Sequence, residues 1–526
     1  MNPWTPVELA GWAAQIAAIG FLLLFGVRAS ELRGPPVPTD VACALVLALG
    51  WAWRLLYQFV LASSGFWYFV ADDPCRWFLA WQWAVNPYVI TWDGVWQGAT
   101  FYVHGLAMRI GSDPLVGSKF VSALYPLIAL LGIFLFTQGV YRDRTLAAAS
   151  VIFLSPWWLH ILLGTGTMTE LPVLGFLLGG AGLFFIGLRS VGRRRRLALA
   201  FAAASFAIAT AFHIVAWMAL ATILAVAFVS AATRGRDRGF GLQAWLVFLL
   251  LATSYCWLWF IGCWIKFGQP LAFIRNYAET TRVIASAIPL GRRLLSYPEA
   301  LVFSIFGFLP LAVYGVISGV VRRSEERNRV RCVIAAAVAF LLILVAASVR
   351  NPGGPPFRLT ITLAGALVPI SLAPLRLLAR TTANSRHDRR SLARLAVLAF
   401  IAVSWFLGNH LKTIGLPHSV QSLDADAISL GVWIRQEIAA PQTLDRASLD
   451  LPIRLWLHEP SLDRFLGIVY ASGLPSRVQE WKGPNPGISS MKRGQYLVTD
   501  RAVDDPALAP QTRHGRYTVY QLQPAE

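Results

Sequence analysis

Two adjacent carboxylates, Asp72 and Asp73, stand directly before Pro74. Neighbouring acids repel each other, which tends to raise the pKa of one of them. A carboxylate of this kind can remove the proton from a hydroxyl nucleophile. The same residues also suit a helix start, with Asp73 as the N-cap and Pro74 as the first helical residue. The two interpretations are compatible, because one acid can cap the helix while the other reacts.

Two further acids are candidates for binding a substrate. Glu170 lies between two apolar segments, just before Leu171 and Pro172. Acids at membrane depth are costly and often functional, but the helix dipole ahead of Pro172 explains Glu170 equally well. Asp93 precedes Gly94, and an Asp-Gly pair is ordinarily a turn signal.

Four basic residues could complete such a site: His213, Arg292, Arg293 and Arg358. An arginine can hold a phosphate with two parallel hydrogen bonds. The structural alternatives are snorkelling of the arginines to the membrane interface and an ordinary packing role for the histidine. The five cysteines have no metal-ligand spacing, and no glycine-rich phosphate loop follows a strand. We therefore assign no metal ligand.

The elements that must position these residues are membrane helices. The chain has 526 residues, of which 56% are hydrophobic and only 14% charged, and its apolar blocks are long enough to cross a bilayer. We predict an all-α polytopic membrane domain over residues 1–411 with about twelve transmembrane helices. The predicted helices are 7–28, 41–62, 119–140, 145–163, 171–188, 197–212, 215–232, 242–264, 300–321, 332–349, 359–379 and 395–411.

The distribution of charge gives the orientation. The net charge is +19, yet residues 412–526 contain twelve bases and twelve acids, so the whole excess lies in the membrane part. Its arginines cluster in every second loop, which marks the cytoplasmic side and argues against a nucleic-acid partner. Both chain ends, the long loops 63–118 and 265–299, and the candidate site residues are then extracytoplasmic.

Residues 412–526 are predicted to form a small soluble α/β domain on that outer face. A helical pattern with acids at its start covers Asp424–Ala439. Strand-like runs are expected at Gly467–Tyr470, Gln495–Thr499 and Tyr517–Leu522.

This layout resembles the GT-C type integral membrane glycosyltransferases, in particular the branch of protein O-mannosyltransferases and aminoarabinose transferases. The resemblance covers about residues 41–410 and depends on the order and sidedness of short motifs. This chain has Asp-Asp where the family often has Asp-Glu, and His213 where the family often has Lys or Arg. The matching elements are Asp72-Asp73, Trp92–Trp96, Ser155-Pro156, Met168-Thr169-Glu170, Gly268–Leu271 and Pro356-Phe357-Arg358.

The resemblance implies a multi-pass enzyme of the inner (plasma) membrane that serves the cell envelope. It would transfer a hexose or pentose, with inversion, from a polyprenyl-phosphate donor to a hydroxyl on a lipid, glycan or protein acceptor. Asp72 or Asp73 would be the general base. His213, Arg292, Arg293 and Arg358 would stabilise the departing phosphate, and Glu170 and Asp93 would bind substrate. Some relatives use a divalent metal, for which oxygen ligands suit Mg²⁺ or Mn²⁺.

Two alternatives remain. A transporter or flippase of lipid-linked sugars would place charges along a path through the membrane and often has repeated halves. The charges here gather at one face and no clear repeat is present, so this hypothesis ranks lower. A membrane scaffold whose C-terminal domain binds a partner is the third.

Overall fold

The computed structural model describes residues 39–523 with gaps. The predicted helix 7–28 lies outside the described residues, as do residues 395–401 and 404 of the predicted helix 395–411, whereas 402–403 and 405–411 are helical. The longer gaps are 64–71 apart from Phe66, 92–95, 234–241, 277–287 apart from Ala278, 306–307, 322–325, 351–355, 384–401, 414–424, 439–454, 475–477, 481–490 and 492–494.

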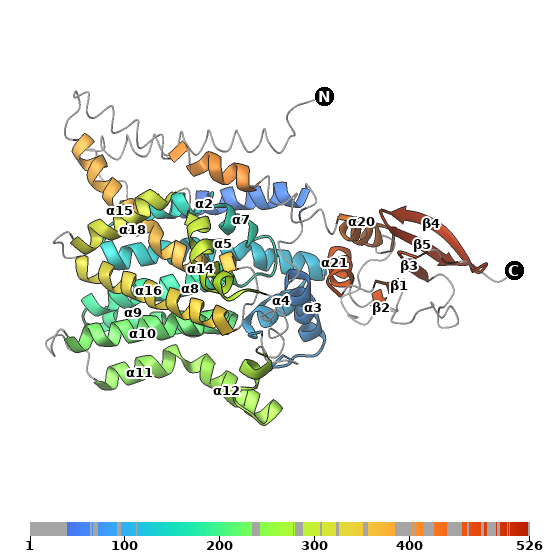
Figure 1. Ribbon diagram of the computed structural model, residues 1–526, viewed down its shortest axis with the longest axis horizontal. Coiled ribbons are helices and arrows are strands. Elements are labelled where there is room, and N and C mark those ends of the chain that lie inside the picture. Colours follow the sequence, from blue (N-terminus) through green and yellow to red (C-terminus); the bar gives the residue numbers. More distant parts are fainter. Residues whose placement is uncertain are drawn as a thin grey trace.

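The larger part of the molecule is a bundle of helices, with a small sheet at one end of its long axis (Figure 1). Among the described residues, five helices are long and apolar enough to cross a membrane (α2, α5, α8, α9 and α16), and α11 with α12, bent by 55° where they meet, counts as a sixth only if the pair is one span. The chain is thus a multi-pass membrane protein, and the count of twelve spans stays a prediction. The helices are α2 (Thr39–Ser63), α3 (Asp72–Val85), α4 (Ala99–Ile110), α5 (Pro114–Tyr141), α6 (Arg144–Leu154), α7 (Trp158–Leu162), α8 (Glu170–Arg189), α9 (Gly192–Phe212), α10 (Val215–Thr233), α11 (Leu242–Ala252), α12 (Ser254–Phe267), α14 (Leu290–Ile305), α15 (Leu309–Val321), α16 (Arg327–Arg350), α17 (Pro356–Leu359) and α18 (Ile361–Ala383).

Three predicted helices are wrong as single elements. Residues 242–264 divide at Thr253 into α11 and α12. Residues 145–163 divide into α6 and α7, because Pro156 has no N–H to donate and disfavours a helical residue before it. Residues 300–321 divide between α14 and α15, and α14 begins ten residues earlier than expected, inside the predicted loop 265–299. Pro310 fits the first turn of α15 but could not continue a helix from the preceding turn.

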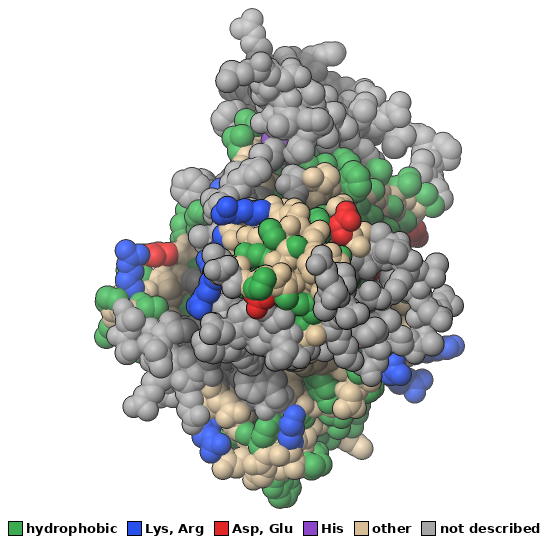
Figure 2. Space-filling view, turned by 90° about the vertical axis from the view of Figure 1, so that its right-hand side faces the viewer, with side chains coloured by type: hydrophobic (Ala, Val, Ile, Leu, Met, Phe, Trp, Pro, Cys, Tyr) green, Lys and Arg blue, Asp and Glu red, His purple; other side chains and the backbone are tan. Residues whose placement is uncertain are grey.

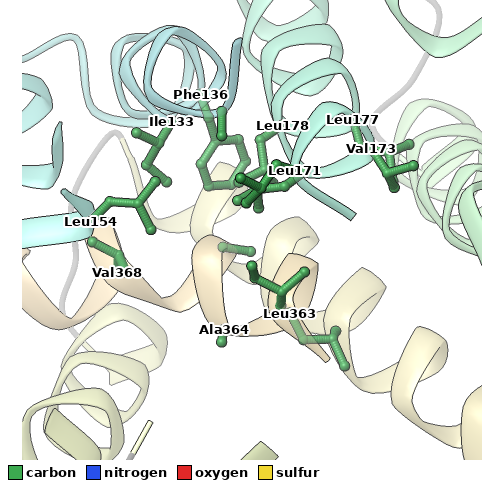
Figure 3. Close-up of a cluster of buried hydrophobic side chains, with 14 of the residues drawn as sticks. Ile133, Phe136, Leu154, Leu171, Val173, Leu177, Leu178, Leu363, Ala364 and Val368 are labelled. Carbon is green, nitrogen blue, oxygen red and sulfur yellow. The ribbon is translucent and has the colours of Figure 1, made fainter. Parts of the chain in front are cut away.

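The centre of the bundle is the crossing of α5 and α8, against which α18 packs. Figure 3 shows this core, where Ile133 and Phe136 of α5 meet Leu171 and Leu178 of α8 above Leu363 of α18. All five side chains are almost completely buried. Apolar side chains lose little by leaving lipid, so close packing must supply much of the stability of such a crossing.

Glycines allow the two helices to touch. A Cβ atom on Gly132 would lie 2.5 Å from the Cα of Gly175, and one on Gly139 would lie 2.6 Å from the Cα of Gly182. These pairs are two helical turns apart on each helix, so the backbones run in contact over that length. Any larger residue would push α8 away, and α8 carries Glu170 at its start.

Gly132→Leu is therefore expected to destabilise the protein by about 1–3 kcal/mol, the usual cost of overpacking a core. The midpoint of thermal unfolding in detergent measures this. Gly291→Leu is the matched control, because a Cβ at this exposed position meets no atom within 4 Å. Equal midpoints for the two variants would contradict the close crossing.

The C-terminal part is an α/β unit. Its strands form one sheet in the order β2-β1-β3-β5-β4, in which β1 is parallel to β2 and β3, and β5 is antiparallel to β3 and β4. The predicted helix after residue 424 and the two later strands are confirmed. The elements are α20 (Ala425–Trp433) with a π-turn η2 (Ile434–Ile438), β1 (Leu455–His458), α21 (Leu462–Ser472), β2 (Val478–Glu480), β3 (Tyr496–Thr499), β4 (Leu508–His514) and β5 (Tyr517–Leu522).

The predicted strand Gly467–Tyr470 is wrong, because these residues belong to helix α21. All four are buried. A short apolar run that is buried on every side has no polar face, so its periodicity does not separate a strand from a buried helix.

Helix α21 docks the C-terminal unit onto α3. The rings of Trp77 and Tyr470 meet edge to face with centroids 5.5 Å apart, inside a hydrophobic cluster that both parts share. Arg435 and Asp113 form an ion pair across the same boundary. Figure 2 views the molecule from this end, and its described side chains carry both charge signs without one dominant patch. The C-terminal unit therefore lies on the same side of the membrane as α3.

Candidate active site

Helix α3 begins with the paired acids, which have different surroundings. The Asp73 side chain is fully buried, whereas 35% of the Asp72 side chain is exposed. Arg76 follows one helical turn later, so its side chain lies on the same face of α3 as Asp72. Helix α3 thus presents one accessible carboxylate and one buried arginine to the same region.

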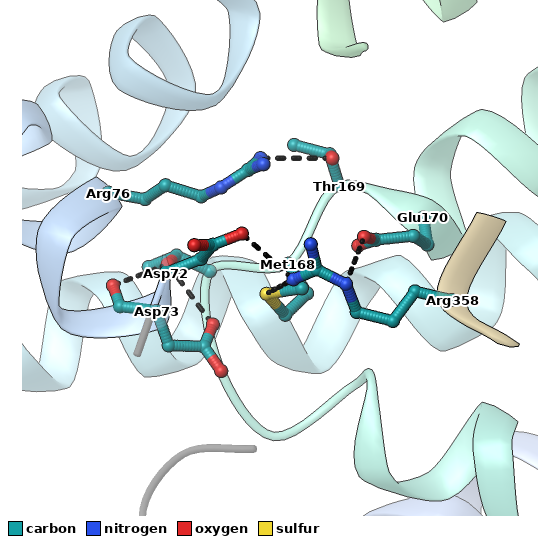
Figure 4. A network of polar contacts seen from close by, with 8 residues as sticks. Asp72, Asp73, Arg76, Met168, Thr169, Glu170 and Arg358 are labelled. Carbon is teal, nitrogen blue, oxygen red and sulfur yellow. Dashed lines mark hydrogen bonds and ion pairs between the residues drawn. The ribbon is translucent and has the colours of Figure 1, made fainter. Parts of the chain in front are cut away.

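Arg358 of α17 joins two acids that are far apart in the sequence (Figure 4). Its Nη1 donates to Oδ2 of Asp72 over 2.9 Å, and its Nε lies 3.6 Å from Oε1 of Glu170 at the start of α8. Arg358 and Glu170 are 6% and 4% exposed. The structure therefore brings Asp72, Glu170 and Arg358 into one cluster.

Asp73 and Arg76 hold the loop 163–170 that leads into α8. The Thr167 hydroxyl donates to the main-chain oxygen of Asp73 over 2.8 Å, and it lies 3.2 Å from Oδ1 of the same residue. Arg76 Nη1 donates to Oγ1 of Thr169 over 3.0 Å. Gly166 is required here, since a Cβ would lie 2.3 Å from the Asp73 carboxylate. The Asp73 carboxylate is thus enclosed by this loop, and Asp72 is the more accessible acid.

Lys119 of α5 links the same loop to the C-terminal unit. Its Nζ donates to the main-chain oxygen of Thr165 over 2.6 Å and lies 5.1 Å from the ring centroid of Tyr470 in α21. A cation over an aromatic face is attracted by the ring quadrupole. The docked C-terminal unit therefore contributes to the support of the site.

The cationic neighbours determine the charge state of Asp72. Burial raises the pKa of its carboxyl, but Arg358 and Arg76 outweigh burial and bring the net pKa below its ordinary value. The predicted rise in the pKa of one of the two paired acids is therefore not seen at Asp72. The arginines keep this carboxylate ionised and able to accept a proton at neutral pH.

His213, the residue after α9, belongs to the same electrostatic environment. Burial lowers its pKa to about 3, and the charges of Arg76 and Arg358 act in the same direction. The Val215 N–H donates to His213 Nδ1 over 3.1 Å. The ring is therefore neutral at physiological pH, with its proton assigned to Nε2, and it offers a neutral donor rather than a cation.

The remaining candidates stand apart from these contacts. Arg292 is exposed at the start of α14. Arg293 donates from Nε to the main-chain oxygen of Ile288 over 2.7 Å and from Nη1 to that of Val349 over 3.1 Å. Asp93 lies outside the described residues. The structure thus gives Arg293 a helix-anchoring role and leaves its predicted phosphate contact a prediction.

The described acids of the cluster do not fit a metal ion. Among the residues that the structure describes, no three His, Cys, Asp or Glu side chains are grouped so that they could hold a metal ion. Asp72 and Glu170 both pair with Arg358, whose guanidinium lies between them where a divalent cation would have to bind. This donor set does not fit Mg²⁺ or Mn²⁺, and no step below uses a metal.

Sequence reasoning missed several members of the cluster. Arg76 could have been found, because its spacing of four residues from Asp72 places both on one helix face. Lys119 is an isolated charge beside a long apolar run, which is itself a functional signal. Thr167 and Thr169 give no such signal, since many hydroxyls occur in polar loops.

Comparison with known proteins gives the fold. No protein-family model and no curated protein sequence matches this chain. Among solved structures, ArnT from Cupriavidus metallidurans bound to undecaprenyl phosphate superimposes with a TM-score of 0.56 at 13% identity, over 90% of this chain and 97% of ArnT. The chain shares the fold of ArnT, the GT-C fold.

Two further solved structures are similar to this chain. ArnT in the apo state matches the GT-C fold of this chain with a TM-score of 0.54 at 13% identity, over 89% of this chain and 97% of ArnT. The Archaeoglobus fulgidus oligosaccharyltransferase tethered to an acceptor peptide gives 0.49 at 12% identity, over 87% of this chain and 69% of that protein.

Proposed function

We propose that this chain is an inverting membrane glycosyltransferase that moves a sugar from a polyprenyl-phosphate donor to a hydroxyl acceptor. The observation that carries the proposal is the accessible Asp72 carboxylate, held ionised by Arg358 and Arg76 beside the buried Glu170. A base next to cationic donors is what displacement of a phosphate leaving group requires.

In the proposed reaction, Asp72 accepts the proton of the acceptor hydroxyl. The oxygen of that hydroxyl attacks the anomeric carbon of the donor sugar at the same time. The bond from that carbon to the phosphate oxygen breaks, and the polyprenyl phosphate leaves with the bonding electrons. Arg76, Arg358 and the Nε2–H of His213 stabilise the negative charge on the departing phosphate. Glu170 fixes the guanidinium of Arg358 from its other side. Attack opposite the leaving group inverts the anomeric centre.

The position of the cluster supports a site on the extracytoplasmic face of the inner membrane. Glu170 begins α8 and Arg189 ends it, and this helix of 20 residues is about 30 Å long. Arg193 to Arg196, in the first turns of α9, follow closely after Arg189. The acids thus lie at the end of α8 opposite an arginine-dense segment, and such segments mark the cytoplasmic side.

ArnT, which shares the fold, has been seen with undecaprenyl phosphate bound. This supports a lipid-phosphate donor for the present chain.

Vesicles that contain the purified protein distinguish transfer from transport. With a radiolabelled polyprenyl-phosphate sugar and a hydroxyl acceptor, we expect a new glycosidic bond and release of polyprenyl phosphate. Movement of the intact donor across the bilayer without bond formation would favour the transporter or flippase hypothesis. A scaffold would give neither result.

Thr167→Val is expected to lower the rate of transfer about tenfold, as loss of a positioning contact commonly does, with little change in the KM for the donor. The variant removes the hydroxyl that joins the loop 163–170 to α3. Thr167→Ser keeps that hydroxyl and should restore most of the rate. A rate as low in Thr167→Ser as in Thr167→Val would contradict the role of the hydroxyl, because serine retains it.

A further inference from the structure

A second candidate site lies at the opposite end of the helices from Asp72. A pocket of about 330 Å³ opens between the start of α2 and the C-terminal ends of α5 and α8. Ala44 and Leu47 of α2 and Leu135 of α5 give it an apolar wall. This wall is made by membrane-spanning helices, so it extends from the pocket toward the hydrocarbon of the bilayer.

Arginines surround the polar end of this pocket. Arg144, Arg189 and Arg194 line it, against one acid, Asp40. Asp40 and Arg144 form a 3.0 Å ion pair, but both side chains are largely exposed, and exposed pairs of this kind contribute little. The pocket therefore carries a net positive charge next to an apolar wall.

The position of one guanidinium is fixed before any ligand binds. Arg189 donates from Nη1 to the main-chain oxygen of Gly139 over 2.7 Å and from Nη2 to that of Gln138 over 2.9 Å. These bonds satisfy carbonyls at the end of α5 and hold the cation at the pocket.

An unsatisfied donor also lines the pocket. The side-chain Nε2 of Gln138 is buried and has no hydrogen-bond partner among the described residues. A buried amide without an acceptor costs free energy that an oxygen ligand would recover. An oxygen-rich anion at the arginines would supply such an acceptor.

We propose that this pocket binds an anionic phospholipid of the cytoplasmic leaflet. Its phosphate would lie against Arg144, Arg189 and Arg194 and accept from Gln138, and an acyl chain would follow the wall formed by α2 and α5. Basic pockets between membrane helices on this side are suited to acidic head groups. A free phosphate or nucleotide would use the arginines but leave the apolar wall uncovered.

A cysteine in the pocket allows a direct test. Cys43 lines the pocket, whereas Cys332, which is similarly half-buried, lies near the arginine-rich start of α16 and outside the pocket. The protein would be placed in vesicles of phosphatidylethanolamine with or without phosphatidylglycerol. Alkylation of both cysteines by N-ethylmaleimide, which crosses bilayers, would be followed by mass spectrometry.

We expect phosphatidylglycerol to slow the alkylation of Cys43 at least about threefold, because occupancy protects a site in proportion to ligand concentration over Kd. Cys332 should react at the same rate in both vesicles. Equal alkylation rates of Cys43 in the two vesicles would overturn the proposal. Equal protection of Cys43 by inorganic phosphate in vesicles without phosphatidylglycerol would also overturn it, since a soluble anion would then be the ligand.

Charge-matched variants separate a site from general attraction to the membrane. Arg144→Gln with Arg194→Gln removes two pocket cations and should abolish the protection of Cys43. Arg193→Gln with Arg196→Gln removes the same amount of charge from exposed positions outside the pocket, and Cys43 should stay protected in this double variant. Equal loss in the two double variants would show that surface charge alone attracts the lipid, and retention in both would show that these arginines do not hold it.

Discussion

Replacing Arg358 by glutamine is expected to lower the rate of transfer about 10²- to 10³-fold, the usual cost of removing a principal electrostatic stabiliser. The variant leaves Asp72 and Glu170 without the cation that pairs both of them. It also removes a donor that would hold the leaving phosphate. The effect should fall on kcat more than on KM, because phosphate charge develops as the bond breaks.

The same variant should change the pH dependence in a defined direction. In the wild-type protein, burial raises the pKa of Asp72, and Arg358 and Arg76 lower it to a net value below the ordinary one. Without Arg358, less positive charge opposes the effect of burial, so the pKa of Asp72 rises. The acid limb of the rate profile, where Asp72 becomes protonated and can no longer act as a base, should therefore move to higher pH.

Two variants control this prediction. Arg358→Lys retains the charge without the forked geometry and should shift the acid limb less than the glutamine variant. Arg292→Gln removes an exposed arginine and should leave the profile unchanged. An acid limb that stays in place in Arg358→Gln would mean that Asp72 is not the titrating base.

Asp72→Asn is expected to reduce the rate of transfer about 10²- to 10⁴-fold, the contribution typical of a general base. Asparagine keeps the shape of the side chain but does not accept the proton. Binding of the donor should survive, since Arg76, Arg358 and His213 remain.

Asp73→Asn provides the matched comparison within the same dipeptide. Asp73 is fully buried, and its main-chain oxygen, which the variant retains, accepts the stronger of the two Thr167 contacts. We expect a loss of less than about tenfold, in the range of a positioning contact, and no added loss when Asp73→Asn is combined with Asp72→Asn. A greater loss in Asp73→Asn than in Asp72→Asn would reverse the assigned roles.

The sequence predicted those members of the cluster that are charged and lie next to a long apolar run. Asp72 and Glu170 are acids beside long apolar runs, and Arg358 directly precedes one, where charged residues are costly and often functional. The alternation of basic loops placed all three on one side of the membrane. The structure brings them together, although no spacing in the sequence indicated that Arg358 lies between the two acids.

The sequence did not predict how the two aspartates divide their roles. That division depends on Gly166 and Thr167, which approach Asp73 only after the loop 163–170 folds against α3. The neutral state of His213 likewise depends on Arg76 and Arg358 arriving from other elements. Such contacts are tertiary, so residue types and spacing carry little information about them.

The predicted elements failed for local reasons. The breaks between α6 and α7 and between α14 and α15 occur near prolines within apolar runs that were long enough to span the membrane. Helix α21 was mistaken for a strand because its buried residues are apolar on every face. For the broken helices and for α21, the composition correctly predicted an apolar environment. It did not predict where a helix breaks or whether a buried run is a strand or a helix.

The most direct measurement of the central claim is an experimental structure of this protein with polyprenyl phosphate bound. We predict density for the phosphate within hydrogen-bonding distance of Arg358 or Arg76, beside Asp72 and at the membrane face opposite the arginine-dense loops. A phosphate located elsewhere, with Asp72 and Arg358 paired as before and no route from them to the lipid, would contradict the proposed active site.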